Sequence, residues 1–276
     1  MPFNPNNSAH NFGNALALAQ ASALAYEPAE ARIRLDLPAI LGTPLQEFRN
    51  FIYPETDTHV FMAATDKAII VAFRGTVSRQ NWLSNGEIVQ VQYRNIGRVH
   101  AGFQRALNIA MPDVQATLTT WSGAGRTLWF TGHSLGGALA HLAVANLRFP
   151  LDPAVTAPRP VTGLYTFGQP RIGSQEFCSA CSSGFGEFHF RYVNNRDIVT
   201  RVPPRVALYW HTGKVRYIDQ DGAIQEDPSF WHRFLDLVEV GQAVFDQMRT
   251  GQIEVEEVSD HKIANYINLI TAAAAI

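Results

Sequence analysis

Residues 132–136 read Gly-His-Ser-Leu-Gly, a G-x-S-x-G pattern that makes Ser134 a candidate nucleophile. A short apolar run at residues 127–131 precedes this pattern, and a segment of strong helix formers at residues 138–147 follows it. Between a strand and a helix, the two glycines allow a sharp turn that presents the serine hydroxyl at the helix start, where free N–H groups stabilise an oxyanion. The alternative is an ordinary turn with a serine cap, which this context disfavours.

A serine nucleophile needs a general base, and the best candidate is His261. In this type of turn the acid and then the histidine follow the serine in the chain. The histidines after the serine are His141, His189, His211, His232 and His261. The first four lie on the following helix, within a strand pattern, or beside aromatic residues, where we expect structural roles. His261 precedes the last predicted helix, so its loop could bring it to the serine.

The acid that orients the base is predicted to be Asp197. It follows the strand pattern at residues 188–193 almost directly, and strand ends are where sites gather in α/β proteins. Asp219, Asp221 and Asp227 lie in a polar region rich in turn residues, where we expect them to be solvated. The candidate triad is therefore Ser134, Asp197 and His261.

The elements that must position these residues alternate between strand and helix patterns. Strands or extended segments are predicted at residues 60–64, 68–73, 127–131, 163–167, 188–193, 206–210 and 215–218. Helices are predicted at residues 14–25, 103–121, 138–147, 230–248 and 262–271. No element is predicted between residues 26 and 44, where Pro and Gly punctuate the chain. This alternation favours a mainly parallel central sheet with helices on both faces.

Composition excludes several functional classes. A net charge of −2 with scattered Lys and Arg among 276 residues argues against a nucleic-acid partner and against a polybasic membrane anchor. No apolar run approaches the roughly 18 residues that a membrane span needs. The length suits one domain over residues 1–276. Because the first residues lack the pattern of a secretory signal, we expect a cytoplasmic protein by default, with export by another route as the alternative.

The two cysteines, Cys178 and Cys181, stand in a C-x-x-C spacing. That spacing can indicate a redox pair or half of a zinc site, but the sequence has no second cysteine pair and the flanking residues indicate a helical turn. We therefore expect two inert thiols and no disulfide framework.

Several further segments carry a resemblance to one known family. They are residues 71–76 (Val-Ala-Phe-Arg-Gly-Thr), 81–82, 99–103, 131–138, 167–171 (Phe-Gly-Gln-Pro-Arg), 194–204 and 260–261. In these segments and their order the chain resembles the class 3 lipase family, the fungal-type triacylglycerol lipases with relatives among feruloyl esterases and phospholipases A1. The resemblance implies an α/β-hydrolase fold and a triad of Ser134, Asp197 and His261, in agreement with the assignment above.

The resemblance also implies an oxyanion hole and a lid. One oxyanion donor would be Thr76, through its backbone N–H and its hydroxyl, and the other would be the N–H of Leu135. The lid would be a mobile helix over residues 77–86, in which the apolar side chains are Val77, Trp82 and Leu83. Because this apolar stripe is narrow, we expect weak closure. The alternative is a surface helix pinned by its tryptophan.

The sequence thus predicts a serine carboxylic-ester hydrolase that acts on lipid esters through an acyl-enzyme, as a triacylglycerol lipase or esterase, without a metal or organic cofactor. Its partners would be a lipid ester and, transiently, a lipid–water interface. A phospholipase A1 or a feruloyl-type esterase is the nearest alternative. A non-catalytic binding protein on the same fold is more remote, because such a fold would typically have lost a triad member or an oxyanion donor.

Overall fold

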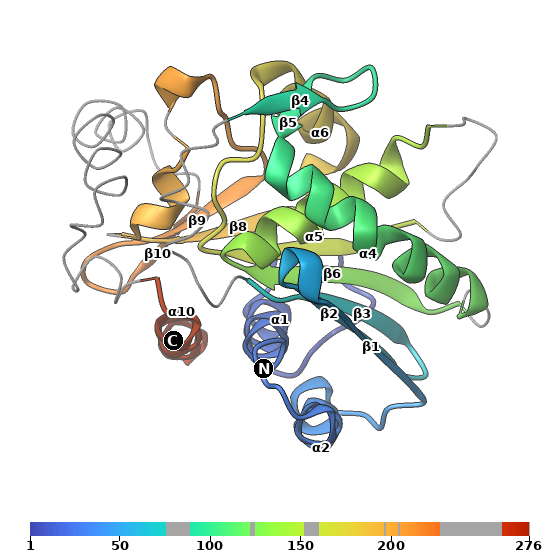
Figure 1. Cartoon of the computed structure of the whole chain (residues 1–276). Coiled ribbons are helices and arrows are strands. Elements are labelled where there is room, and N and C mark those ends of the chain that lie inside the picture. The colour runs from blue at the N-terminus through green and yellow to red at the C-terminus, as the bar shows by residue number, and fades with distance from the viewer. Residues whose placement is uncertain are drawn as a thin grey trace.

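The computed structural model describes residues 1–75, 89–121, 125–151, 160–195, 197–203, 205–226 and 261–275. In these ranges the chain forms an eight-stranded sheet in the order β1-β2-β3-β6-β7-β8-β9-β10, with helices on both faces (Figure 1). The predicted helix at residues 230–248 and the predicted lid at residues 77–86 lie outside the described residues. The assignment of residues 1–276 to one domain stays a prediction.

The sheet is parallel in its centre and antiparallel at its two edges. Its strands are β1 (Glu47–Tyr53), β2 (Thr58–Ala64), β3 (Ala68–Phe73), β6 (Thr127–His133), β7 (Gly163–Phe167), β8 (His189–Asn194), β9 (Lys214–Ile218) and β10 (Ile224–Glu226). The pairs β3–β6, β6–β7, β7–β8 and β8–β9 are parallel, whereas β1–β2, β2–β3 and β9–β10 are antiparallel. The prediction of a mainly parallel sheet is confirmed, and the carboxyl ends of five strands meet at one edge.

Strand β3 shows why the central strands form where they do. Its sequence, Ala-Ile-Ile-Val-Ala-Phe, has no polar residue, and every residue in it is buried. Ile69, Val71 and Phe73 pack into the core on one face of the sheet, while Ala68, Ile70 and Ala72 pack into the core on the other. A strand covered on both faces reads as an unbroken apolar run rather than as an alternation.

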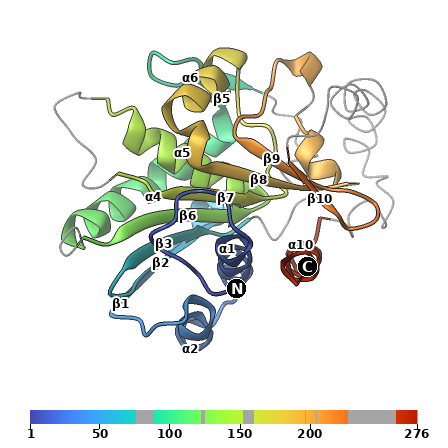
Figure 2. The same cartoon turned by 180° about the vertical axis from the view of Figure 1, so that it is seen from behind.

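The helices divide between the two faces of the sheet. One face carries α4 (Ala101–Thr120), α5 (Leu135–Arg148) and α6 (Gln175–Phe185), and the other carries α1 (Phe12–Leu24), α2 (Glu30–Leu41) and α10 (Ile263–Ala274) (Figures 1 and 2). A small sheet of β4 (Gln90–Gln92) and β5 (Arg98–His100) lies beside α6. Helices α1 and α10, from the two ends of the chain, pack against each other. None of the described helices is long and apolar enough to cross a bilayer.

Several elements differ from the prediction: helix α2 and strands β1, β4, β5 and β10 were not predicted. Helix α2 was missed because Pro38 interrupts the helical pattern, and Gly42 ends the helix in a left-handed conformation (φ 71°). The segment predicted as extended at residues 206–210 instead begins as a single helical turn, η4 (Arg205–Ala207). The chain leaves that turn through Leu208, which also has a left-handed backbone (φ 61°), and a Leu208 N–H to Arg205 carbonyl bond of 2.8 Å closes it.

The two cysteines lie in α6, as the predicted helical turn requires. Both are free and buried, and burial raises the pKa of the Cys178 thiol to about 12. A thiol that stays protonated is a poor nucleophile and a poor metal ligand. Within the ranges that the structure describes, no group of three or more His, Cys, Asp or Glu side chains is arranged to hold a metal ion.

Candidate active site

Ser134 occupies a strained turn between β6 and α5. Its backbone has φ 59° and ψ −133°, a conformation that side-chain-bearing residues rarely adopt. The flanking glycines permit this turn, because a Cβ on Gly132 would lie 2.2 Å from the Gly136 carbonyl oxygen, and one on Gly136 would lie 2.2 Å from the Phe73 carbonyl oxygen. The Ser134 N–H donates to the Phe167 carbonyl at 2.9 Å and so ties the turn to β7.

The hydroxyl of Ser134 is buried and has no hydrogen-bond partner within the described ranges. A buried hydroxyl without a partner costs free energy, so an arrangement that keeps one is expected where the group must react. Helix α5 begins at Leu135, whose N–H lies in the first turn and so has no acceptor within the helix. Gly75 also approaches the serine, since a Cβ on it would lie 3.0 Å from the Ser134 Cβ. The next residue, Thr76, lies outside the described residues.

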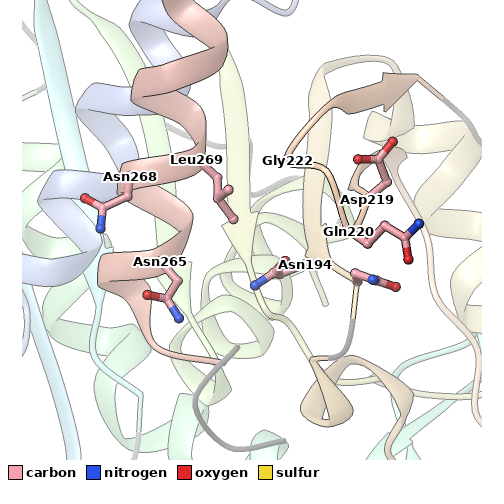
Figure 3. Close-up of a pocket in the computed structure, with 8 residues that line it drawn as sticks. Asn194, Asp219, Gln220, Gly222, Asn265, Asn268 and Leu269 are labelled. Atoms are coloured by element: carbon pink, nitrogen blue, oxygen red, sulfur yellow. The ribbon is translucent and has the colours of Figure 1, made fainter. Parts of the chain in front are cut away.

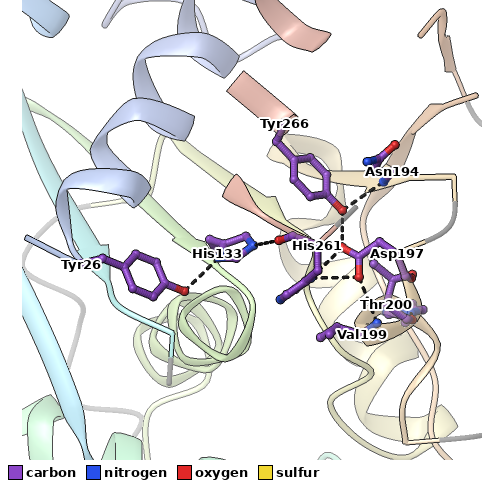
Figure 4. A network of polar contacts seen from close by, with 9 residues as sticks. Tyr26, His133, Asn194, Asp197, Val199, Thr200, His261 and Tyr266 are labelled. Carbon is purple, nitrogen blue, oxygen red and sulfur yellow. Dashed lines mark hydrogen bonds and ion pairs between the residues drawn. The ribbon is translucent and has the colours of Figure 1, made fainter. Parts of the chain in front are cut away.

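Asp197 and His261 form a fully buried pair (Figure 4). The His261 Nδ1 lies 2.8 Å from Oδ2 and 2.9 Å from Oδ1 of Asp197, so that Nδ1 carries the hydrogen and donates it. The opposite ring nitrogen, Nε2, has no partner among the residues described and is available as a proton acceptor. The structure thus brings together two of the three predicted triad residues in the relation of an acid that orients a base.

Two further donors hold the Asp197 carboxylate. The Val199 N–H donates to Oδ1 at 2.9 Å, and the Tyr266 hydroxyl donates to Oδ2 at 2.5 Å. Burial and the Asp197 charge raise the pKa of Tyr266 well above its usual value, so the phenol remains a donor. Tyr266 lies on α10, and its oxygen also accepts the N–H of Asn194 at the end of β8 (3.0 Å). Tyr266 of α10 therefore holds the acid, and the same helix begins two residues after the base.

Gly168 provides the space in which the acid and the base meet. It follows β7 with a left-handed backbone (φ 59°). A Cβ there would lie 2.7 Å from the Asp197 Oδ2 and 2.9 Å from the His261 Nδ1. Only glycine can occupy this position without displacing one of the two side chains.

His133, the residue before the nucleophile, contacts the backbone of the base. Its Nε2 lies 2.6 Å from the carbonyl oxygen of His261, and its Nδ1 lies 2.8 Å from the Tyr26 hydroxyl. The His133 and His261 rings are 4.5 Å apart between centroids. Figure 4 shows this chain of contacts running from Tyr26 to Asp197.

The other candidates that the structure describes lie outside the chain of contacts from Tyr26 to Asp197, although the His211 Nε2 lies 2.6 Å from the carbonyl oxygen of Thr200, whose hydroxyl donates to the Asp197 carbonyl at 2.7 Å. Burial, the largest cause, lowers the pKa of His141 to about 3 and those of His189 and His211 well below the usual value. His232 and Asp227 lie outside the described residues. Asp219 accepts hydrogen bonds within its own turn from the N–H groups of Asp221 and Ala223.

A polar pocket of about 460 Å³ opens between α10 and the turn that joins β9 to β10 (Figure 3). Its lining residues are mostly amides: Asn194, Asn195, Asp219, Gln220, Gly222, Asn265, Asn268 and Leu269. None of the candidate triad residues lines it, and a single leucine is its only large apolar side chain. This pocket does not suit an acyl chain.

Four residues around the candidate triad have no assigned role in the sequence analysis. Gly168 lies in the Phe-Gly-Gln-Pro-Arg segment. A glycine directly after a predicted strand is the sequence feature that could have indicated its role. His133 is the first variable residue of the G-x-S-x-G pattern, and Tyr266 follows the predicted base by five positions. Tyr26 has no local signal, because its contact with His133 spans 107 residues of sequence.

Comparison with known proteins places this geometry in context. The family model for lipase (class 3) matches residues 70–207. A secreted mono- and diacylglycerol lipase 1 of Fusarium solani is 34% identical over 174 residues, which are 59% of this chain and 48% of the relative. A lipase of Rhizomucor miehei is 31% identical over 178 residues, or 63% of this chain and 48% of the relative. The chain thus spans about half the length of these curated relatives.

Solved structures resemble the chain over a larger share of its length. Lipase II from Rhizopus niveus superposes with a TM-score of 0.66 at 27% identity, covering 79% of this chain and 84% of that one. The lipase from Rhizopus microsporus var. chinensis gives a TM-score of 0.65 at 28% identity, covering 83% of this chain and 85% of that one. The fold of the chain is the α/β-hydrolase fold of these fungal lipases.

Proposed function

This chain belongs to the class 3 lipase family, and on that premise we propose that it hydrolyses carboxylic esters of lipids with Ser134 as nucleophile, His261 as base and Asp197 as acid. One observation carries the proposal. The buried pair joins the His261 Nδ1 to the Asp197 carboxylate at 2.8 Å, and neither the His261 Nε2 nor the Ser134 hydroxyl has a hydrogen-bond partner among the residues that the structure describes. A base and a nucleophile that are both unengaged suit a site that awaits a substrate.

In the proposed reaction, the His261 Nε2 accepts the hydroxyl proton of Ser134 while Oγ attacks the ester carbonyl carbon. The Asp197 carboxylate stabilises the imidazolium that forms. The imidazolium then gives its proton to the departing alcohol, which leaves an acyl-enzyme. A water molecule, deprotonated by the same nitrogen, attacks this acyl group and releases the acid, and the serine recovers its proton.

The oxyanion hole is proposed from the N–H groups of Leu135 and Thr76, with the threonine hydroxyl as a third donor. The position of Leu135 at the start of α5 supports this proposal, as does the close approach of Gly75 to Ser134. A lid over residues 77–86, with Val77, Trp82 and Leu83 facing the cleft, remains part of the proposal.

For the substrate, we propose an acylglycerol. The Fusarium solani relative is named as a mono- and diacylglycerol lipase, and a structural neighbour is titled a triacylglycerol lipase with a serine protease triad. The amide-lined pocket beside α10 does not alter this choice, because it lies apart from the nucleophile.

We also propose that the protein is exported. Relatives from Fusarium solani and Penicillium cyclopium carry the word secreted in their names, which favours export over the cytoplasmic default. Finding the protein only in the cell fraction of its native host would contradict export.

The proposed activity is tested with a series of esters from acetyl to stearoyl, alongside emulsified triacylglycerol and phospholipid. We expect hydrolysis of soluble short-chain esters below their solubility limit, with at most a modest rise in rate when droplets form, because a lid with three sizeable apolar side chains closes weakly. We expect Ser134→Ala to lose about 10⁴-fold or more in kcat and to escape labelling by a fluorophosphonate probe.

Each other outcome corrects a different part of the proposal. If Ser134→Ala kept more than about one hundredth of the rate, the nucleophile would be wrong. A clear preference for phospholipid would make the protein a phospholipase, and activity only above the solubility limit would mean a tightly closed lid.

A further inference from the structure

We propose that Tyr26 and His133 form a positioning pair that holds the main chain of the catalytic base, His261, in register with the nucleophile. The inference rests on the proposed function, because it assigns these residues a role in the same reaction. Neither residue touches the reacting atoms, so their effect passes through the carbonyl of His261 (Figure 4).

The hydrogen-bond partners define which ring nitrogen of a neutral His133 carries the hydrogen. The His261 carbonyl oxygen can only accept, so the His133 Nε2 must carry the hydrogen of the 2.6 Å contact. In a neutral ring Nδ1 is then an acceptor, and the Tyr26 hydroxyl donates to it at 2.8 Å. Tyr26 thereby selects the tautomer that can bind the backbone of the base.

The covalent chain gives this contact its consequence. His133 ends β6 and is bonded to Ser134, whereas His261 precedes α10. The contact between the His133 Nε2 and the His261 carbonyl therefore links the nucleophile's strand directly to the base's loop. The Asp197 carboxylate fixes the orientation of the His261 ring, and His133 fixes the backbone from which that ring projects.

Because both ring nitrogens of His133 are hydrogen-bonded, this residue does not compete with His261 for the proton of the nucleophile. His133 directly precedes the nucleophile and is only 1% exposed. The centroid of its ring lies 4.5 Å from that of the His261 ring. A free imidazole acceptor there would compete for protons with the base. With Nε2 bound to a carbonyl and Nδ1 bound to a phenol, the only acceptor nitrogen is engaged.

Tyr26 reaches the site from the chain that follows α1 (Phe12–Leu24). Its hydroxyl lies so close to Gly75 that a Cβ there would be 2.2 Å from it. The same Gly75 position borders Ser134 and precedes Thr76, the proposed oxyanion residue. The Tyr26 hydroxyl therefore lies where the chain that follows β3, the end of β6 and the base come together.

The test compares three substitutions on a soluble short-chain ester. His133→Leu removes the donor at similar size, His133→Gln replaces it with an amide N–H that can reach the same carbonyl, and Tyr26→Phe removes only the hydroxyl. We expect His133→Leu to lower kcat about 10- to 100-fold with KM unchanged within twofold, since a displacement of about 1 Å costs this much. The kcat of His133→Gln should be about tenfold higher than that of His133→Leu. Tyr26→Phe should lower kcat a few-fold relative to the wild type.

The matched control is His141→Leu, which replaces another buried histidine on the same helix–strand unit but outside the network. Its melting temperature calibrates the loss of packing. The positioning pair is refuted if His133→Leu and His133→Gln are equally impaired, if the loss appears in KM, or if it merely follows the melting temperature. Should His133→Leu fail to fold, an unchanged kcat in Tyr26→Phe refutes the pair, because His133→Gln keeps a donor for the His261 carbonyl and tests only the replacement.

The wild-type protein separates this inference from the proposed function. A folded wild type that neither hydrolyses any ester nor reacts with a fluorophosphonate would refute the proposed function itself. An active wild type with unimpaired His133 and Tyr26 variants would refute only the positioning pair.

Discussion

Two pairs of buried histidines lie in contact, one at the nucleophile and one in the core, and they differ in what surrounds them. His141 and His189 pack ring against ring at 5.0 Å between α5 and β8, and His133 and His261 do so at 4.5 Å at the carboxyl edge of the sheet. All four are at most 1% exposed. Burial therefore does not distinguish a candidate base from a histidine of the core.

The partners make the difference. Neither ring nitrogen of His141 has a hydrogen-bond partner in the part of the chain that the structure describes, and its ring contacts those of Phe177 and Phe185. Burial first, and the charge of Arg191 second, lower its pKa to about 3, so it remains neutral. His261 instead faces a carboxylate that can stabilise its cation. A buried imidazole can accept a proton when its partner compensates for the lost solvation.

The largest effect should come from removing that carboxylate. Asp197→Asn leaves His261 as buried as before but without an anionic partner, which makes its surroundings resemble those of His141. We expect kcat on a soluble ester to fall about 10⁴-fold, because the amide cannot stabilise the imidazolium and favours the wrong tautomer. The melting temperature should change far less.

Asp113→Asn is the control for this variant. Asp113 is an exposed carboxylate on α4 that accepts a bond from Tyr53, and its loss should leave kcat unaltered. A rate for Asp197→Asn within tenfold of the wild type would transfer the acid role to another carboxylate.

A smaller effect should follow when the space around Asp197 and His261 is reduced while the carboxylate keeps its charge. Gly168→Ala places a methyl group 2.7 Å from the Asp197 Oδ2, so the acid and the base must separate or shift. We expect a fall in kcat of about 10- to 100-fold, which is the usual consequence of a misplaced catalytic group.

Gly42→Ala provides a matched control for backbone strain. Gly42 has a similar left-handed backbone (φ 71°), but a Cβ there meets nothing within 4 Å. Both variants should lose about 1–2 kcal/mol of stability from the strained backbone, and only Gly168→Ala should lose activity. Equal activity in the two variants would show that the space beside the acid is not needed.

The contrast between the pairs also marks what sequence can predict. The central strands and the positions of Asp197 and His261 were predicted because they depend on local signals, namely an unbroken apolar run, a strand end and the start of the last helix. The structure then brings these two side chains to 2.8 Å. Their role as acid and base, and that of Ser134 as nucleophile, remain the proposal that the variants above test.

The supporting contacts could not be predicted in the same way. Tyr26 meets His133 across 107 residues, and Tyr266 meets Asp197 across 69. Such contacts arise only when the sheet assembles and α1 and α10 pack on one face of it. Helix α2 escaped prediction for a local reason, because Pro38 interrupts its pattern while Ile33, Leu37 and Leu41 are buried by tertiary packing.

The smallest effect on activity, and the sharpest contrast with the catalytic pair, is expected from His141→Leu. Because His141 has a pKa near 3 when folded and an ordinary value of 6.5, the unfolded chain binds more protons between these values. Stability that is fully present above pH 6.5 is therefore lost as the pH falls towards 3, by about 2 kcal/mol between pH 7 and pH 5 for this one group. His141→Leu should remove that share, so urea midpoints at the two pH values should lie closer together than in the wild type, while kcat at pH 7 stays within twofold. An unchanged pH dependence would mean that His141 binds a proton as readily in the folded protein as in the unfolded chain, and burial alone would then no longer explain why one histidine pair is inert.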